Sequence, residues 1–177
     1  MIEPNYFSHF GLAPGFNIDE AQLKKKFLEL SRANHPDFHT HLSQDEQSTI
    51  LELSSYTNQA FKTLKNEDAR MKYLLGLHEI DFKEGNQSLP QEFLMEMMDF
   101  NEKLMEAQMD MEEKVVNSLK EELKGIETEL KAEVQSSIDN YDSSLITAEE
   151  LNKLKDYYFK KKYLLRIHEN LDKFGTS

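Results

Sequence analysis

Apolar side chains recur at intervals of three and four residues along most of the chain, which is the spacing of one face of an α-helix. In the N-terminal half, this pattern predicts a short turn over Tyr6 to Leu12, then a helix that Asp19 caps and Pro36 ends. A polar loop, Pro36 to Ser43, leads to a second long helix, and Asp68 is the predicted cap of a shorter one after it. The apolar positions of these three helices are Leu23, Phe27 and Leu30; Ile50, Leu53, Thr57, Ala60, Phe61 and Leu64; and Met71, Leu74 and Leu75.

Three more helices are predicted after Pro90, a residue suited to a first helical turn. The first spans roughly Gln91 to Met109, and the last begins at the capping box Thr147 to Glu150 and runs to about Phe174, closed by Gly175. The helix between them carries Val115 or Val116, then Leu119, Leu123, Ile126, Leu130, Val134 and Ile138. No alternating strand pattern of useful length occurs, so the predicted fold class is all-α.

The segment Asp81 to Leu89 is the predicted domain boundary, because it contains Gly85, Asn86 and Ser88 between two helical regions. The charge also changes there: 8 basic and 11 acidic residues precede Asp81, whereas 13 basic and 22 acidic residues follow from it onward. We therefore expect an N-terminal helical domain over residues 1–80, a linker over 81–89, and a C-terminal three-helix bundle over 90–177.

The net charge of −12 argues against nucleic acid or an anionic membrane as the main partner, since both require positive charge. The chain has no cysteine, which excludes disulfides, thiolate metal sites and cysteine nucleophiles. No apolar run approaches the roughly 18 residues of a membrane span. The first residues lack the basic and apolar regions of a secretory signal, so the expected location is the cytoplasm.

The tripeptide His35-Pro36-Asp37 lies between the two longest predicted helices of the N-terminal domain. Pro36 fixes its own backbone, so His35 and Asp37 would lose little entropy on binding a partner. A carboxylate such as Asp37 also accepts charge-assisted hydrogen bonds from Arg or Lys. The alternative is that the tripeptide is only a helix stop followed by a loop.

The flanking residues favour the functional interpretation, because the region from Tyr6 to about His78 resembles a J domain. The residues that carry the resemblance are Tyr6, Phe7, Phe10, Gly11 and Leu12; Leu23, Phe27 and Leu30; His35, Pro36 and Asp37; Asn58, Gln59, Ala60, Phe61 and Leu64; and Arg70, Tyr73, Leu74 and Leu75. Phe38 departs from the family, where many members have Lys, and Asn66-Glu67 replaces a common proline.

The resemblance implies that the tripeptide contacts a DnaK-type chaperone and promotes ATP hydrolysis by it. Lys24, Lys25 and Arg32 are then candidate electrostatic contacts, although basic residues on a helix often form only a solvated face. A rival interpretation is a metal-dependent hydrolase site, because one loop supplies four candidate metal ligands, His35, Asp37, His39 and His41. Alternate spacing in a loop does not preorganise such a site, so we expect no metal or other cofactor.

The predicted helix from Gln91 contains two apolar arcs rather than one. We place the residues at intervals of about 100° around the helix axis, with Phe93 at zero. Within about 40° of Phe93 lie Met97, Phe100, Leu104, Ala107 and Met111, as in an ordinary core stripe. Leu94, Met98, Met105 and Met109 lie between about 100° and 160°, Met95 lies near 200°, and acidic residues border them. Methionine is over-used at adaptable binding surfaces, but a helix that touches two neighbours can also bury both arcs.

The segment Phe93-Leu94-Met95-Glu96 with Met97-Met98-Asp99 resembles the scaffold-binding helix of the HscB family of J-domain co-chaperones. Met98 and Asp99 stand where that family more often has Leu and Glu. The resemblance implies binding of the iron–sulfur scaffold protein IscU, and delivery of it to an HscA-like chaperone for cluster transfer. The implied contacts are Leu94, Met95, Met98, Asp99, Glu102 and Glu106, with an aromatic of the last helix, for which Phe159 is the candidate.

We expect a co-chaperone and not an enzyme, since the ATPase chemistry would belong to the partner. The alternative is a general J-domain protein whose bundle binds a different client or dimerises. Exposure of the second apolar arc distinguishes a binding helix from a helix that is core on both sides.

Overall fold

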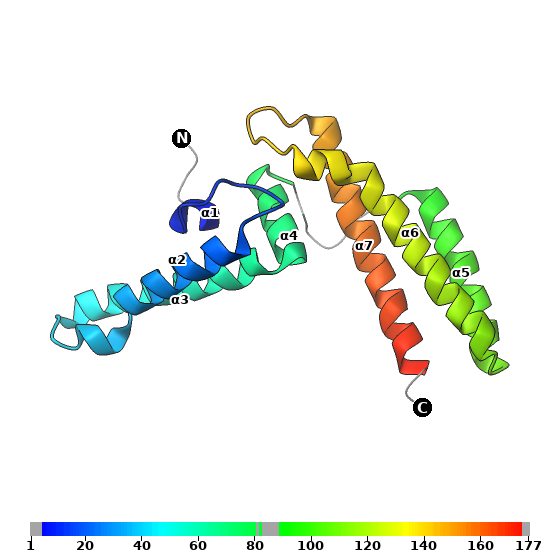
Figure 1. Ribbon diagram of the computed structural model, residues 1–177, viewed down its shortest axis with the longest axis horizontal. Helices are drawn as coiled ribbons and strands as arrows, with labels where there is room; N and C mark the ends of the chain where they lie inside the picture. Colours follow the sequence, from blue (N-terminus) through cyan, green and yellow to red (C-terminus); the bar gives the residue numbers. More distant parts are fainter. Residues whose placement is uncertain (1–4, 81, 83–88, 175–177) are drawn as a thin grey trace. The chain divides into compact units, whose positions relative to one another are not determined.

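The computed structural model describes residues 5–80, 82 and 89–174, without the side chains of Pro36 and of residues 172–174. Within these residues every regular element is helical, so the all-α prediction is confirmed (Figure 1). None of the described helices is both long and apolar enough to cross a membrane. The elements are α1 (Tyr6–His9), α2 (Glu20–Ala33), the 3-10 turn η1 (Pro36–His39), α3 (Gln44–Lys65), α4 (Glu67–Leu77), α5 (Gln91–Met109), α6 (Glu113–Asp139) and α7 (Ala148–Phe174).

The chain divides into two compact units. The first contains the residues up to His78 together with Tyr141–Leu145, and the second contains Glu79–Asn140 and the residues from Ile146 onward. Most of the predicted linker, residues 81 and 83–88, and the predicted closing residue Gly175 lie outside the described residues. The grouping of Tyr141–Leu145 with the first unit has no counterpart in our sequence prediction.

The first unit is organised around α2 and α3, which run alongside each other as a hairpin (Figure 1). Leu23 of α2 and Leu64 of α3 are buried, and the rings of Phe27 and Phe61 stack at 4.0 Å between centroids. Side chains from α1 and α4, including Phe7, Leu74 and Leu75, complete the core. The His35-Pro36-Asp37 tripeptide therefore lies at the turn of this hairpin, in the connection between α2 and α3.

One of the predicted helix boundaries in this unit is wrong, and two others are confirmed. Asn66, not Asp68, caps α4, because the backbone of Asn66 is extended and its Oδ1 accepts from the Ala69 amide at 2.8 Å. The end of the helix before Pro36 is confirmed: α2 stops at Ala33, and His35, the residue before the proline, has an extended backbone. The predicted polar loop then begins with η1. The Asp19 cap is confirmed, since its Oδ1 accepts from the Gln22 amide at 2.9 Å.

Arg70 of α4 is buried, and its guanidinium joins two backbone segments. Its Nε donates to the Phe16 carbonyl at 2.8 Å, and its Nη1 donates to the Leu64 carbonyl at the end of α3. Burial lowers the pKa of Arg70, whereas the charges of Glu67 and Glu20 raise it. The side chain thus fastens the segment that precedes α2 to the C-terminal end of α3.

Tyr141 closes the same unit from the loop between α6 and α7. Its ring packs edge-on against Phe16 at 5.0 Å, and its hydroxyl shares a hydrogen bond of 2.6 Å with Nε2 of His78. Burial raises the pKa of Tyr141 to about 12, and burial lowers the pKa of His78. Both groups are therefore uncharged near neutral pH, which is the state that a partly buried hydrogen bond of this kind favours.

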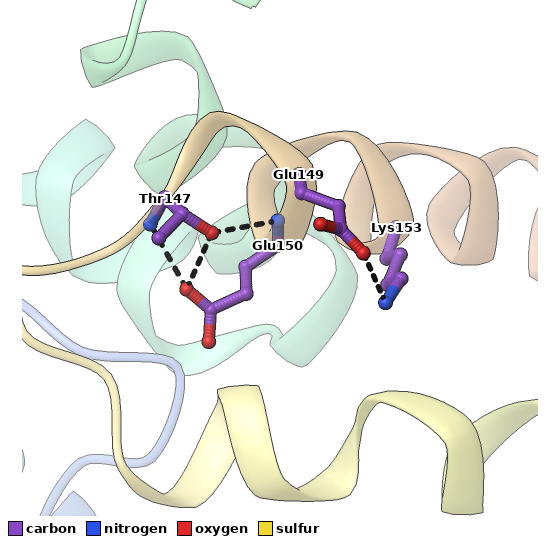
Figure 2. A network of polar contacts seen from close by, with 4 residues as sticks. All are labelled: Thr147, Glu149, Glu150 and Lys153. Carbon is purple, nitrogen blue, oxygen red and sulfur yellow. Dashed lines mark hydrogen bonds and ion pairs between the residues drawn. The ribbon is translucent and has the colours of Figure 1, made fainter.

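The second unit consists of α5, α6 and α7. Most predicted apolar positions of α6 are buried, with Val116 rather than the exposed Val115 at its start and Ile126 half-buried. The predicted capping box begins α7: the Thr147 amide donates to Glu150 Oε2 at 2.9 Å, and the Glu150 amide donates to Thr147 Oγ1 at 3.2 Å (Figure 2). Pro90 is the N-cap of α5 rather than its first helical residue.

We expect Arg70→Ala to lower the free energy of unfolding of the first unit by about 2–4 kcal/mol, because two buried carbonyls lose their donor. Chemical denaturation followed by circular dichroism measures this change. Lys62→Ala, which removes an exposed cation from α3, is the matched control and should change stability by less than about 0.5 kcal/mol. Equal stability of the two variants would contradict the role that we assign to Arg70.

We expect a fragment of residues 1–85 to remain helical, because nearly all core side chains of the first unit precede residue 80. Its melting temperature should be lower than that of the first unit in the full chain, since Phe16 and His78 lose their contacts with Tyr141. Full-length Tyr141→Ala should reproduce that decrease. A fragment that is unfolded by circular dichroism would show that the boundary over residues 81–89 is wrong.

Candidate functional site

The His35-Pro36-Asp37 tripeptide forms the start of η1, where His35 is the N-cap. His35 Nδ1 accepts from the Asp37 amide at 3.3 Å, and the rings of His35 and Phe38 lie 5.6 Å apart. An imidazole that accepts at Nδ1 carries its proton on Nε2, so the neutral ring keeps a donor for a partner. Asp37 itself is exposed, with Oδ2 at 3.7 Å from His35 Nδ1. The turn therefore presents a donor and a carboxylate side by side.

The three predicted basic contacts of α2, Lys24, Lys25 and Arg32, are exposed, but they do not share one face. Lys25 and Arg32 are separated by seven positions and lie within about 20° of each other, whereas Lys24 lies roughly 80–100° away. Lys24 instead lines a shallow groove of the hairpin, together with Phe27 and Phe61. Within the described residues, Lys24, Lys25 and Arg32 form no ion pair, unlike Lys26, which bonds Glu29 at 3.2 Å. The structure thus groups Lys25 with Arg32 and separates Lys24 from both.

The metal-site interpretation requires His35, Asp37, His39 and His41 to converge. The Nε2 atom of His39 instead lies 2.7 Å from the Ala33 carbonyl, as expected for a ring nitrogen that donates to it. In the part of the chain that the structure describes, no three His, Asp or Glu side chains form a group able to hold a metal ion. The loop geometry therefore lends no support to that interpretation.

The two apolar arcs of α5 lie in different environments. The first is buried and consists of Phe93, Met97, Phe100, Leu104 and Ala107. Of the second, Leu94 is half-buried, and Met95, Met98, Met105 and Met109 are between 60% and 74% exposed. The interpretation that both arcs are core is therefore wrong. The predicted acidic residues Asp99, Glu102 and Glu106 are also exposed, on the side of this arc that faces away from the core stripe.

Met111 does not belong to the core stripe in which we placed it. It is 81% exposed and has a left-handed backbone, with φ of 55°. The helix ends at Met109, so the regular rotation per residue no longer applies beyond that point. The prediction failed because the sequence contains no glycine or proline that marks the end of α5.

Two aromatic side chains of α7 have different neighbours. Phe159, the predicted one, is half-buried, and its ring lies 5.6 Å from that of Phe82. Tyr163, one turn further on, contacts α5: its ring is 5.8 Å from that of Phe93, and its hydroxyl is 3.5 Å from Nδ2 of Asn101. Our sequence interpretation missed Tyr163, although its spacing of four residues from Phe159 places both on one side of α7.

Comparison with protein families and known proteins shows similarity along nearly the whole chain. A family model described as the HSCB C-terminal oligomerisation domain matches residues 89–172. The human protein named iron-sulfur cluster co-chaperone protein HscB is 32% identical over 168 residues, which are 94% of this chain and 67% of that protein. A co-chaperone protein HscB homolog from Shewanella halifaxensis is 31% identical over 173 residues, with 94% of this chain and 98% of that protein covered.

Two solved structures are also similar to this chain along nearly its whole length. The crystal structure of human co-chaperone protein HscB has a TM-score of 0.76 at 28% identity, with 98% of this chain and 83% of that chain covered. The chaperone HscB from Vibrio cholerae has a TM-score of 0.64 at 26% identity, with 95% of this chain and 99% of that chain covered. The similarity therefore includes both units.

We expect the triple variant Leu94→Ala, Met95→Ala, Met98→Ala to lose only about 1–2 kcal/mol of stability, mostly through the half-buried Leu94. The matched control is Phe93→Ala with Phe100→Ala, which truncates two buried rings of the same helix at about 3–5 kcal/mol each. Thermal melts of the two variants test the assignment of both arcs. A triple variant that melts as low as the double variant would place its three residues in the core.

Proposed function

Because this chain belongs to the HscB family of iron–sulfur cluster co-chaperones, we propose that it works by joining two partners. Its J domain stimulates the ATPase of an HscA-like chaperone of the DnaK type. Its C-terminal bundle binds an IscU-like scaffold protein and delivers it to that chaperone for cluster transfer. The observation that carries the proposal is a pair of exposed surfaces, one in each unit: the His35-Asp37 turn, and the second arc of α5.

The turn suits a docking role because its geometry is set before any partner arrives. Pro36 restricts the backbone, and the hydrogen bond from the Asp37 amide to His35 fixes the imidazole. A partner Arg or Lys can then bond the Asp37 carboxylate, and Lys25 with Arg32 would meet acidic groups of the chaperone on one face of α2. The hydrolysis of ATP takes place in the chaperone, so this chain needs no catalytic group of its own.

The surface of α5 suits a protein partner for a different reason. Leu94, Met95 and Met98 offer apolar contact area, and methionine adapts its shape to a partner at small cost. The acidic groups Asp99 and Glu102 border that area and would pair with basic residues of the scaffold. Phe159 of α7 adds an aromatic side chain, a residue type that interface cores favour.

A second copy of this chain is the alternative occupant of the same surface, since the matching family model is described as an oligomerisation domain. Analytical ultracentrifugation distinguishes the two occupants. A monomer that binds the scaffold supports the proposal, whereas a dimer that the scaffold cannot dissociate supports the alternative.

We expect Asp37→Asn to abolish stimulation of the chaperone ATPase, because the amide lacks the negative charge that attracts a partner Arg or Lys and replaces one acceptor oxygen with a donor. The fold should be unaffected, since Asp37 is exposed. Single-turnover ATP hydrolysis by the chaperone, with the full chain added, measures the effect. Asp45→Asn, the same change in the first turn of the neighbouring α3, is the control and should stimulate normally. A folded Asp37→Asn protein with normal stimulation would rule out the proposed role of the turn.

A further inference from the structure

The exposed arc of α5 extends well beyond Met98, the last apolar residue of α5 assigned to scaffold binding. Met105 and Met109 are 60% and 74% exposed, and they continue the line of Leu94 and Met98. Successive intervals of four, seven and four residues keep these four side chains within about 60° around the helix. At a rise of 1.5 Å per residue, the line from Leu94 to Met109 is about 22 Å long. Leu94 and the three methionines thus form a stripe along the helix rather than a local patch.

Asn101 fills the gap in this stripe between Met98 and Met105. Its Nδ2 donates to the Met97 carbonyl at 2.7 Å and lies 3.5 Å from the Tyr163 hydroxyl. Both contacts come from the nitrogen, and reversing the amide would set two oxygens against each other at Met97, so its orientation is fixed. Among the described residues nothing donates to Asn101 Oδ1, which leaves one acceptor at the middle of an apolar stripe.

The two sides of the stripe differ in charge. One side carries the exposed carboxylates Asp99, Glu102 and Glu106, and the other carries Tyr163 of α7. Across Gln91–Asp110 as a whole there are six acidic residues and a single Lys. A partner that covers the stripe must therefore be apolar along its centre and basic along one edge.

We propose that the scaffold surface extends along α5 to Met105 and Met109, and that Asn101 sets the register of the segment that binds there. This inference rests on the proposed function. The occupant is an amphipathic helix of the scaffold, with basic residues on one flank and a hydrogen-bond donor opposite Asn101. Leu94, Met98, Asn101 and Met105 alternate at four, three and four residues, which is the spacing of a seam between two helices. A single polar residue in such a seam fixes the register, because any shift buries it against apolar groups.

The first test is calorimetric titration of the full chain with the IscU-like scaffold of the same organism. Met105→Ala with Met109→Ala should weaken binding by tenfold or more, because truncated interface anchors commonly have effects of this size. Met111→Ala, which removes an equally exposed methionine outside the stripe, should leave the affinity within twofold. Equal affinities of the double variant and the wild-type chain would overturn the extension.

The second test concerns the register. Asn101→Leu should weaken scaffold binding by about tenfold, since the partner's donor would be buried without an acceptor. Asn101→Asp keeps an acceptor oxygen but loses both donors, so it should bind within threefold of the wild-type chain if the acceptor matters. A merely structural role, through the bonds that Nδ2 makes, predicts that both variants weaken binding equally. That result, or normal binding by Asn101→Leu, would overturn the role of Asn101.

The triple variant Leu94→Ala, Met95→Ala, Met98→Ala separates this inference from the proposed function. If the triple variant binds weakly and the Met105/Met109 variant binds normally, the extension is wrong and the proposed function stands. If the folded triple variant also binds normally, the proposed function itself fails. If the Met105/Met109 changes abolish self-association of the chain and leave scaffold affinity unchanged, the stripe belongs to a second copy and the inference is overturned.

Discussion

The buried stripe of α5 is the constraint on which the proposed binding surface depends. Phe93, Met97 and Phe100 are held in the core of the second unit, so α5 cannot rotate about its axis without exposing two large rings. That fixed rotation directs the second arc away from the core, although its methionines are as apolar as many core residues. The free energy gained by burying the first arc therefore keeps the second arc exposed, so that the second arc needs no conformational change to become accessible.

In the first unit, the position of the tripeptide depends on buried hydrogen bonds as well as on apolar packing. Arg70 links the Phe16 carbonyl, which precedes α2, to the Leu64 carbonyl, which ends α3. Both ends of the hairpin are thus fixed at the side opposite to η1, and the stacked rings of Phe27 and Phe61 hold its middle. The J-domain hairpin needs no buried contact at the turn itself, so His35 and Asp37 remain exposed for a partner.

Much of this arrangement could be predicted from the sequence, because periodicity and family motifs are local. The bounds of α5, the Thr147 capping box and membership of the HscB family were predicted and are confirmed. The failures have physical causes: Asn66 and Asp68 are both good caps, and only the backbone geometry selects Asn66. The exposure of Met111 follows from a helix end without a glycine. The positions of Tyr141 and Tyr163 depend on contacts between segments far apart in sequence, which no local pattern encodes.

Charge explains why an exposed apolar stripe is compatible with a specific heterologous partner. A second copy of the chain that covered the stripe with its own α5 in antiparallel orientation would bring two rows of carboxylates together, and like charges oppose such an approach. A basic amphipathic helix meets no such repulsion, and it gains from the same carboxylates that disfavour self-association. In the proposed function, the acidic residues and the methionine stripe act together: the stripe supplies contact area with little selectivity, and the acidic residues select which partner can use it. This division of roles would place specificity in Asp99, Glu102 and Glu106, whose charges act at longer range than apolar contacts.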